Sequence, residues 1–453
     1  MTQATRYLTA IWQALGGAPD AVERVAVTGA GSLPSVFPVT DLAAASVAVA
    51  GLAASDLIGG PAVTVDRRLA SFWFGFSLRP QGWKLPPAWD AVAGDYRAAD
   101  GWVRLHTNAP HHRAAALSVL GTAADRAAVA DAVACWPAAR LEAAVVAAGG
   151  CAAEMRGLEA WADHPQGRAV ASAPLLELEP AVVPADRPAW TPDPARPLAG
   201  LRVLDLTRVL AGPVATRFLA GLGADVLRID PPDWNEDAVV PDVTLGKRCA
   251  RLDLHRPDDL ALLKALLARA DVLVHGYRPD ALTRLGLGAE QRRALNPGLV
   301  DICLDAYGWG GPWAGRRGFD SLVQMSSGIA DAGMRTLGRD APTPLPVQAL
   351  DHATGYILAA MVLRGLAHRS RTGRGMTGRT SLAATAGLLV GLAGPELDTA
   401  PLASETPADF SPAVEVTAWG PVRRFLPPVL VAGAPLAWDR PAEPLGSSVP
   451  TWD

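Results

Sequence analysis

Cysteines are scarce in this sequence of 453 residues. There are four, at positions 135, 151, 249 and 303, and no two of them form a C-x-x-C pair. This spacing favours neither a zinc site nor a disulfide framework, so we predict no metal site. A reducing cytoplasm is the expected location of a protein with so few cysteines. The net charge of −4 is slightly negative and gives no electrostatic reason to expect a nucleic-acid partner.

Long apolar runs are also missing. The alanine-rich run 42–54 is interrupted by Ser46, and we expect it to be too short to cross a bilayer. The first 17 residues have no compact basic region followed by a clean apolar run, so we expect no signal peptide and no membrane partner. Half of the residues are hydrophobic and 19% are charged, which is enough for a large core. The length suggests about two to three domains.

A glycine-rich dinucleotide fingerprint is absent where one might be expected. Residues 198–230 read LAGLRVLDLTRVLAGPVATRFLAGLGADVLRID and predict a strand, a helix and a second strand. The loop 207–212, TRVLAG, is not G-x-G-x-x-G, although Asp230 stands where a ribose-binding acid would lie. A structural βαβ unit is one interpretation of this stretch, and an NAD or FAD site is a weaker one. Further strand and helix patterns up to residue 304 predict an α/β fold with a parallel sheet.

The same stretch resembles the start of the family III CoA-transferases, the CaiB/BaiF type. This family includes formyl-CoA transferase, carnitine CoA-transferase and α-methylacyl-CoA racemase. The similarity lies in the words LxGLRVLDLTRVLAGPxAT and LGADVLRID. It implies a Rossmann-like parallel sheet domain, a smaller α+β domain, and an enzyme of acyl-CoA metabolism.

The order of the segments departs from that family. Residues 37–180 resemble its C-terminal part, and residues 200–390 resemble its N-terminal part. We therefore predict a rearranged C-terminal-type portion at 1–180, a proline-rich linker at 181–197, and a CoA-binding domain at 198–453. Segment 346–369 also resembles segment 37–60, since both place an aspartate before an alanine-rich helix.

Asp351 is the predicted catalytic residue. From the sequence alone, an aspartate before a helix at 352–369 is a good N-cap. The resemblance implies a nucleophile at this position, before a G-x-x-x-A-A helix. An ionised carboxylate needs no general base and can form an acyl anhydride and then an aspartyl-CoA thioester. Asp41 is the matching residue of segment 37–60, but it lacks the following T-G pattern, and we expect it to be a helix cap.

The resemblance also implies residues that bind the CoA thioester, which is a substrate rather than a tightly bound cofactor. They lie in loops after the strands and are Arg208, Val209, Leu210, Gly276, Tyr277, Arg278, Arg284 and Tyr307. Arginine is well suited to phosphate oxygens, although each arginine could instead be a solvated surface charge. Two positions depart from the family: Asp305 stands where some members have lysine, and Pro231 where some have a phosphate-binding arginine.

The resemblance implies transfer of CoA from an acyl-CoA donor to a small carboxylic acid, by a homodimer. Racemisation or epimerisation of a 2-methylacyl-CoA is the near alternative. Racemases of the family have a histidine in a G-H-D motif, and this chain has Phe319, which cannot exchange a proton. His352 and His368 could substitute, although a histidine on a helix is more often structural. A non-catalytic CoA-binding homologue is a third interpretation.

Overall fold

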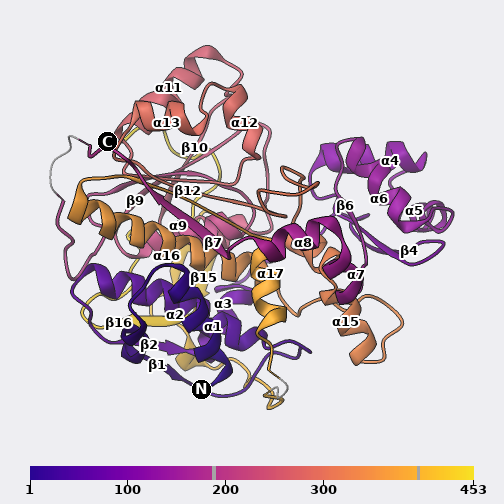
Figure 1. The fold of residues 1–453 in the computed structure, drawn as a ribbon, viewed down its shortest axis with the longest axis horizontal. Coiled ribbons are helices and arrows are strands. Elements are labelled where there is room, and N and C mark those ends of the chain that lie inside the picture. Colours follow the sequence, from indigo (N-terminus) through magenta and orange to yellow (C-terminus); the bar gives the residue numbers. More distant parts are fainter. Residues whose placement is uncertain (186–189, 395–397, 453) are drawn as a thin grey trace.

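The computed structural model describes residues 1–185, 190–394 and 398–452. Its largest feature is a seven-stranded sheet (Figure 1). The strand order is β10 (Lys247–Arg251), β9 (Asp225–Asp230), β8 (Arg202–Leu206), β11 (Val272–His275), β12 (Val300–Asp305), β13 (Met376–Ser381) and β7 (Leu176–Pro180). The first six strands are parallel, and β7 pairs antiparallel with β13 at the edge. The predicted α/β class with a parallel sheet is confirmed.

Strands β8, β9, β11 and β12 are rich in apolar residues because helices cover the sheet. In chain order the helices of this part of the chain are α9 (Ala211–Gly221), α10 (Val240–Val243), α11 (Pro257–Arg269), α12 (Pro279–Arg284), α13 (Ala289–Leu295), α14 (Asp320–Ser326), α15 (Ile329–Thr336), α16 (Ala349–Thr372) and α17 (Leu382–Gly391). The long helix α16 is almost wholly buried, with apolar residues on all sides. It therefore forms the centre of the main hydrophobic core.

The first 80 residues pack onto this core. Their elements are α1 (Gln3–Ala14), η1 (Pro19–Arg24), β1 (Val25–Thr28), α2 (Val39–Leu57), β2 (Val63–Asp66), α3 (Arg67–Gly75) and β3 (Leu78–Pro80). Helix α2 lies alongside α16 (Figure 1). It is long and apolar enough to cross a membrane by length and composition, contrary to the expectation from run 42–54, but 89% of its apolar window is buried inside the protein. The apolar character of α2 is accounted for by this core.

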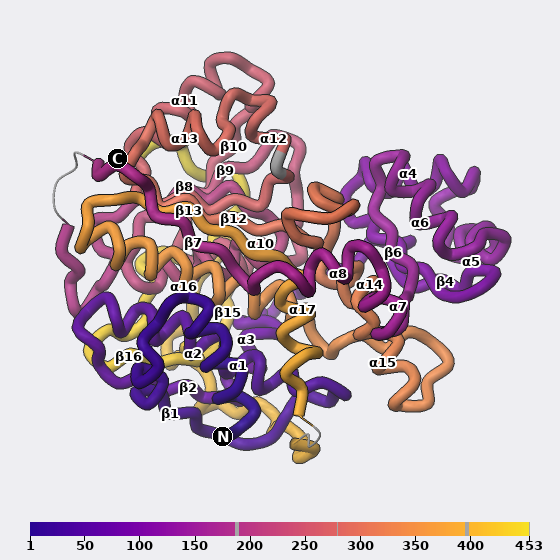
Figure 2. Tube along the Cα trace, in the orientation of Figure 1, coloured from indigo at the N-terminus to yellow at the C-terminus, as the bar shows by residue number. Residues whose placement is uncertain are grey.

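A smaller α+β lobe projects from one side (Figure 2). It contains a sheet of β4 (Gly94–Arg97), β5 (Trp102–Leu105) and β6 (Ala152–Glu154), with α4 (Pro110–Leu120), α5 (Arg126–Ala134) and α6 (Ala138–Ala147). Strands β4 and β5 form an antiparallel hairpin, and its turn contains Asp100 and Gly101. Helices α7 (Leu158–Asp163) and α8 (Pro165–Ser172) lead from the lobe to β7. The lobe has a separate hydrophobic core.

Strand pairs connect the beginning of the chain with its end. The last elements are η2 (Pro407–Asp409), β14 (Glu415–Thr417), β15 (Gly420–Arg424) and β16 (Val429–Val431). Strand β16 pairs with β2, and β15 pairs with β3. The division at a linker 181–197 stays a prediction about how the sequence is organised, and residues 186–189 of that linker lie outside the described residues. In space, residues before and after it share one core.

The resemblance between segments 37–60 and 346–369 extends to the backbone. The residues before the two helices, Pro38 and Gln348, have nearly the same dihedral angles, φ −76° ψ 65° and φ −75° ψ 65°. Each helix is followed by a strand and a further helix, α2–β2–α3 and α16–β13–α17. Each of these strands has a parallel neighbour on one side and an antiparallel neighbour on the other. The chain therefore contains the same helix–strand–helix unit twice.

Candidate active site

The strand order has a switch point between β8 and β11, and we call the carboxyl edge of the sheet at this point the crevice. Counted along the chain, the six parallel strands have the order 3-2-1-4-5-6, and the order reverses between β8 and β11. Ligands of open parallel sheets bind at the carboxyl ends of the strands at such a point. The loops that follow these two strands contain Arg208 and Tyr277. Nη2 of Arg208 donates a hydrogen bond of 2.9 Å to Oη of Tyr277, so the two predicted loops meet here.

Arg208 is held between two aromatic rings. The central carbon of its guanidinium lies 4.8 Å from the ring centroid of Trp234 and 5.2 Å from that of Tyr277. Both distances are within the range of cation–π attraction. Trp234 was not predicted as a site residue, because it lies in a loop with no motif of its own. Its ring and that of Tyr277 fix the direction of the Arg208 side chain.

Val209 has an unusual backbone conformation. Its φ of +65° is the one positive value among the non-glycine residues that the structure describes. A β-branched residue in this region is strained, and such strain is often found at ligand sites. Oε2 of Glu236 accepts the N–H of Val209 at 2.8 Å and the indole N–H of Trp234 at 2.9 Å. Glu236 also forms an ion pair with the buried Arg228, so a fixed carboxylate holds the loop in this shape.

Asp351 lies in the first turn of α16, close to the same loop. The helix begins at Ala349 and its N-cap is Gln348, so the prediction that Asp351 caps a helix at 352–369 is wrong. Gly355, one turn later, packs against the end of the Arg208 loop: a Cβ atom at Gly355 would lie 2.5 Å from the carbonyl oxygen of Ala211. Only glycine permits this approach. The contact brings the first turn of α16 to the carboxyl end of β8.

A second carboxyl group lies beside Asp351. Oδ2 of Asp320 accepts the backbone N–H of Asp351 at 2.9 Å, and the other carboxylate oxygen of Asp320 accepts a hydrogen bond from Nε2 of Gln324. Burial and the charge of Asp320 raise the pKa of the Asp351 carboxyl well above its ordinary value. Burial likewise raises the pKa of Asp320. Two carboxyl groups so close in a buried place do not both ionise readily, and they titrate as a pair.

Asp41 occupies the matching position in α2, and its surroundings are different. It also lies in the first turn rather than at the cap, which is Pro38, so the prediction of a cap is wrong here too. Nη2 of Arg67 lies 3.5 Å from the carboxylate of Asp41, and the backbone N–H of Ala4 donates a hydrogen bond to the same carboxylate. By contrast, the Asp351 carboxylate has no hydrogen-bond or ion-pair partner in the described part of the chain. Within the described residues, the carboxylate of Asp41 therefore has partners in the protein, and that of Asp351 has none.

The residues of this site lie in a segment that matches a known protein family. Residues 198–404 match the sequence model of "CoA-transferase family III". This part of the chain, a little under half of its length, is similar to CoA-transferase family III. The matched segment includes both loops of the crevice, Asp320 and Asp351.

Curated relatives have related names. The "Probable fatty acyl-CoA transferase Rv3272" of Mycobacterium tuberculosis is 35% identical over 197 residues, which are 40% of this chain and 50% of the relative. The "Succinate--glutarate CoA-transferase" of Agrobacterium fabrum is 32% identical over 203 residues, 41% of this chain and 50% of the relative. An "Acyl-CoA transferase" of Gibberella moniliformis is 28% identical over 344 residues, 67% and 60% of the two chains. The chain spans about half the length of the first two relatives.

The histidines considered as substitutes in a family III racemase are not arranged for proton exchange. His352 is buried with its ring 5.1 Å from that of Phe74, and burial lowers the pKa of His352 to about 3. His368 follows Asp351 by 17 positions on the same helix, which corresponds to roughly 25 Å. Phe319 stacks on the buried ring of His106 at 3.7 Å, so the position of the racemase histidine is filled by an aromatic contact.

The other predicted residues differ in accessibility. Gly276 is exposed at the end of β11, and Leu210 precedes α9 and is buried. Arg284 is 68% exposed and forms an ion pair with Asp280, four residues earlier. Tyr307 is buried, and its Oη shares a hydrogen bond of 3.1 Å with Oγ of Ser326. The roles of these residues in CoA binding stay predictions.

Both departures from the family remain visible in the structure. Asp305, where some members have lysine, is largely buried at the end of β12 and accepts the N–H of Gly308 at 2.7 Å. The carbonyl oxygen of Pro231, where some members have arginine, accepts a hydrogen bond of 2.7 Å from Arg251. Neither position supplies a cation to the crevice.

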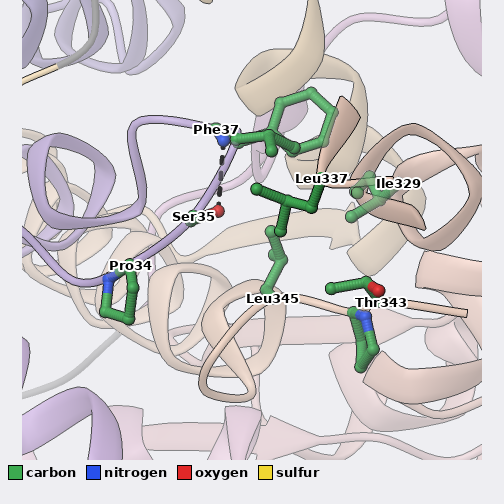
Figure 3. Close-up of a pocket in the computed structure, with 10 residues that line it drawn as sticks. Pro34, Ser35, Phe37, Ile329, Leu337, Thr343 and Leu345 are labelled. Carbon is green, nitrogen blue, oxygen red and sulfur yellow. Dashed lines mark hydrogen bonds between the residues drawn. The ribbon is translucent and has the colours of Figure 1, made fainter. Parts of the chain in front are cut away.

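A small cavity lies behind the segment that leads to α16. It has a volume of about 20 Å³ and lies between residues 34–37, helix α15 and residues 343–345 (Figure 3). Space of this size holds about one water molecule, so it is not a substrate pocket. Leu345 in its wall donates its N–H to Gln324, the residue that contacts Asp320. The cavity therefore borders the residues that support Asp351. No group of metal-ligating side chains occurs in the described parts of the chain.

Proposed function

We propose that this protein is a CoA-transferase that moves CoA from an acyl-CoA donor to a carboxylic acid, with Asp351 as the nucleophile. The observation that carries the proposal is the carboxylate of Asp351, which has no partner among the residues that the structure describes and lies in the first turn of a helix packed against the β8 loop. The match of residues 198–404 to the model of CoA-transferase family III supports it. The names of the relatives support CoA transfer as the reaction class.

The reaction needs four substitutions at carbonyl carbon. The Asp351 carboxylate attacks the acyl thioester, which forms a mixed anhydride and releases CoA thiolate. The thiolate attacks the aspartyl carbonyl, which gives an aspartyl-CoA thioester and frees the donor acid. The acceptor carboxylate then attacks this thioester, and the released thiolate attacks the acceptor acyl group. The products are the CoA thioester of the acceptor acid and the restored Asp351 carboxylate, and no proton is gained or lost.

The surroundings of Asp351 suit this chemistry. The N-terminal turn of α16 has a positive dipole end, which favours negative charge on the carboxylate and on the tetrahedral oxyanion. Asp320 holds the backbone of residue 351 in place through the 2.9 Å hydrogen bond. The raised pKa of the Asp351 carboxyl makes its ionised form a stronger base, and such a carboxylate is a better nucleophile.

Trapping tests the covalent step. The protein is incubated with an acyl-CoA and hydroxylamine, and the peptide containing residue 351 is then weighed by mass spectrometry. We expect a hydroxamate at Asp351 and none at Asp41. Calorimetry with CoA and with NAD separates the two ligand classes, and binding of NAD alone would contradict the proposal. Donor and acceptor are identified by screening carboxylic acids against several acyl-CoA thioesters and detecting new thioesters.

Racemisation is separated from transfer by isotope exchange. A 2-methylacyl-CoA is incubated with the protein in deuterated water. Transfer predicts no deuterium at the α-carbon, because Phe319, His352 and His368 provide no proton exchange opposite Asp351. Rapid uptake without CoA exchange would favour a racemase. CoA binding with neither reaction, for any donor and acceptor in the screen, would favour a non-catalytic homologue.

Two further proposals rest on the sequence: the resemblance implies a homodimer, and the scarcity of cysteines suggests a cytoplasmic location. We expect a homodimer, which light scattering tests, since a strict monomer at high concentration would contradict it. We also expect a cytoplasmic location, which fractionation of the source cells tests.

A further inference from the structure

Helix α14, which carries Asp320, lies between the small lobe and α16 (Figure 2). On the α16 side, Oδ2 of Asp320 accepts the backbone N–H of Asp351. One turn later, Oε1 of Gln324 accepts the N–H of Leu345 at 2.7 Å, in the segment that leads to α16. On its other side, α14 contacts strands β5 and β6 of the lobe. A short helix held from both sides transmits the position of the lobe to the first turn of α16.

A separate hydrophobic cluster joins the lobe to α14. The backbone continues this contact, because Arg156, just after β6, donates its N–H to the carbonyl oxygen of Met325 at 3.0 Å. In the loop before α14, Nη2 of Arg316 donates to Glu142 and to the carbonyl oxygen of Ala152, both at 2.9 Å. The lobe therefore holds α14 near its end and also holds the loop that leads into it. The buried members of the cluster are Cys151, Ala153, Leu322, Met325 and Ala330, and Trp102, Met155 and Phe319 pack against them.

Phe319, the residue before Asp320, stacks on His106 of the lobe. The ring centroids are 3.7 Å apart, and the ring planes differ by only 6°. His106 directly follows β5, and burial, Arg104 and His112 lower its pKa to about 3, so the imidazole is neutral. A neutral ring of this kind packs as a flat aromatic surface. The stack therefore joins the end of β5 to the start of α14.

Residues of the same lobe fix the His106 ring. The ring of Trp89 meets it edge-on, with centroids 5.7 Å apart and planes at 83°. Oδ1 of Asp90 accepts the hydroxyl of Thr107 at 2.7 Å, and the backbone N–H of Asp90 donates to Oδ1 of Asn108 at 3.0 Å. These bonds hold the segment that contains Trp89 against the residues that follow His106. The imidazole is therefore held in place by the lobe itself.

We propose that His106 is a positioning residue for the proposed reaction and that it acts through its stack on Phe319. The stack holds Asp320 in place, and the hydrogen bond of Asp320 holds the backbone of Asp351. The proposal rests on the proposed function, because the reaction that it serves is the one assigned to Asp351. A displacement of about 1 Å at a reacting group costs on the order of a hundredfold in rate. The small lobe thus contributes to catalysis through α14.

The test separates the ring of His106 from its nitrogen atoms. His106→Phe keeps an aromatic ring, His106→Asn keeps a polar group without a ring, and His106→Ala keeps neither. We expect kcat of His106→Ala and His106→Asn to fall about tenfold with KM for the acyl-CoA within about twofold, because a displaced carboxyl group slows the chemical step rather than binding. His106→Phe should keep nearly the wild-type kcat. His255→Ala changes an exposed histidine outside the lobe and is the matched control.

Hydrogen exchange measures the same contact without any substrate. The backbone N–H of Asp351 is protected by its hydrogen bond to Asp320, so its exchange rate reports a displacement of α14. We expect exchange at residue 351 to be about tenfold faster in His106→Ala and unchanged in His106→Phe. Phe319→Leu removes the other ring of the stack and should have the same effect as His106→Ala. The double variant should add little to either single change, because both remove one contact.

The outcomes separate this proposal from the proposed function. If His106→Ala lost unfolding free energy but kept the wild-type kcat, the stack would be purely structural and the proposal would be wrong. If His106→Asn were active and His106→Phe were not, His106 would act through a nitrogen atom, which also contradicts the proposal. If the wild type showed no transfer, the proposed function would be wrong, whereas unchanged exchange at residue 351 in His106→Ala would refute the positioning contact by itself.

Discussion

The carboxylate of Asp320 accepts the backbone N–H of Asp351 at 2.9 Å, so the nucleophile proposed here is supported by a second, wholly buried carboxyl group. The hydrogen bond fixes the backbone of residue 351, while the negative charge opposes ionisation of its side chain. Under the proposed function, Asp320 is a positioning residue whose charge also affects the pH at which the Asp351 carboxyl ionises.

The first prediction concerns this pair. Transfer should increase with pH as the pair ionises, because the pKa of Asp351 is raised and only its carboxylate attacks. Asp320→Asn keeps an oxygen acceptor for the N–H of Asp351 and removes the neighbouring charge. The rise in kcat/KM should therefore move to lower pH by roughly one unit. A purely structural role for Asp320 would reduce activity equally at all pH values, and such a result would contradict the prediction.

The second prediction concerns the packing of distant segments. Asp242 is fully buried, and its carboxylate forms an ion pair of 2.8 Å with Arg217 and accepts the backbone N–H of Ser77 at 3.1 Å. Arg424, near the end of the chain, lies 3.6 Å away. Asp242→Ala leaves the buried guanidinium group of Arg217 without its anion, whereas Arg424 keeps its ion pair with Glu415. The loss should lower the free energy of unfolding by about 3–5 kcal/mol. Urea denaturation measures this loss.

The control for that variant is Asp439→Ala. The side chain of Asp439 is 80% exposed, and its ion pair with Arg196 lies at the surface. Such a pair contributes about 0–1 kcal/mol. If Asp242→Ala lowered the free energy of unfolding as little as Asp439→Ala, segments 76–80 and 217–242 and residue 424 would not unfold as one cooperative unit.

The third prediction concerns Asp305 and pH. Burial raises the pKa of Asp305 to about 7, and its Oδ2 atom has no hydrogen-bond partner among the described residues. Between about pH 4 and pH 7 the folded protein keeps a proton that the unfolded chain has released. The contribution of Asp305 to stability therefore falls as pH rises through this window and stays low above it.

Asp305→Asn removes this titration. The free energy of unfolding of the variant minus that of the wild type should therefore increase by about 2–4 kcal/mol when the pH is raised from 4 to 8. Denaturation curves of both proteins at the two pH values give the difference directly, and any cost of the new amide cancels because it does not depend on pH. Equal differences at pH 4 and pH 8 would show that Asp305 has an ordinary pKa.

Local pattern was enough to predict much of the fold. Buried parallel strands appear in the sequence as short apolar runs, so the two strands expected within 198–230 and the strand patterns up to residue 304 correspond to β8, β9, β11 and β12. The similarity between segments 37–60 and 346–369 also corresponds to a structural repeat. These features depend on residues close together in the chain.

Contacts between distant residues could not be predicted in this way. The start of α16 was misplaced because the N–H of Asp351 is satisfied by Asp320, 31 residues earlier, and no cap at residue 351 is needed. The supporting roles of Trp234 and Glu236 depend on how their loop folds over Val209. The packing of α2 on α16 joins segments about 300 residues apart, and the apolar composition of α2 alone does not indicate its partner.

The last prediction concerns Asp351 itself. Asp351→Asn should reduce transfer on the order of a thousandfold or more, because an amide cannot form the anhydride or the thioester. The fold should be retained. The side chain caps no helix and has no partner in the described structure, and replacing a carboxyl of raised pKa by a neutral amide removes a source of instability above neutral pH. Transfer assays and denaturation curves of the same preparation test both statements.

Asp41→Asn is the matched control, because residue 41 has the same place in the repeated helix–strand–helix unit. Its carboxylate faces Arg67 and the N–H of Ala4, so the substitution should weaken local contacts and leave transfer nearly unchanged. Hydroxylamine trapping should label the wild type and Asp41→Asn at residue 351 and should not label Asp351→Asn. If Asp351→Asn transferred CoA at nearly the wild-type rate, residue 351 would have only a structural role in the first turn of α16. The nucleophile would then have to be sought elsewhere along the crevice.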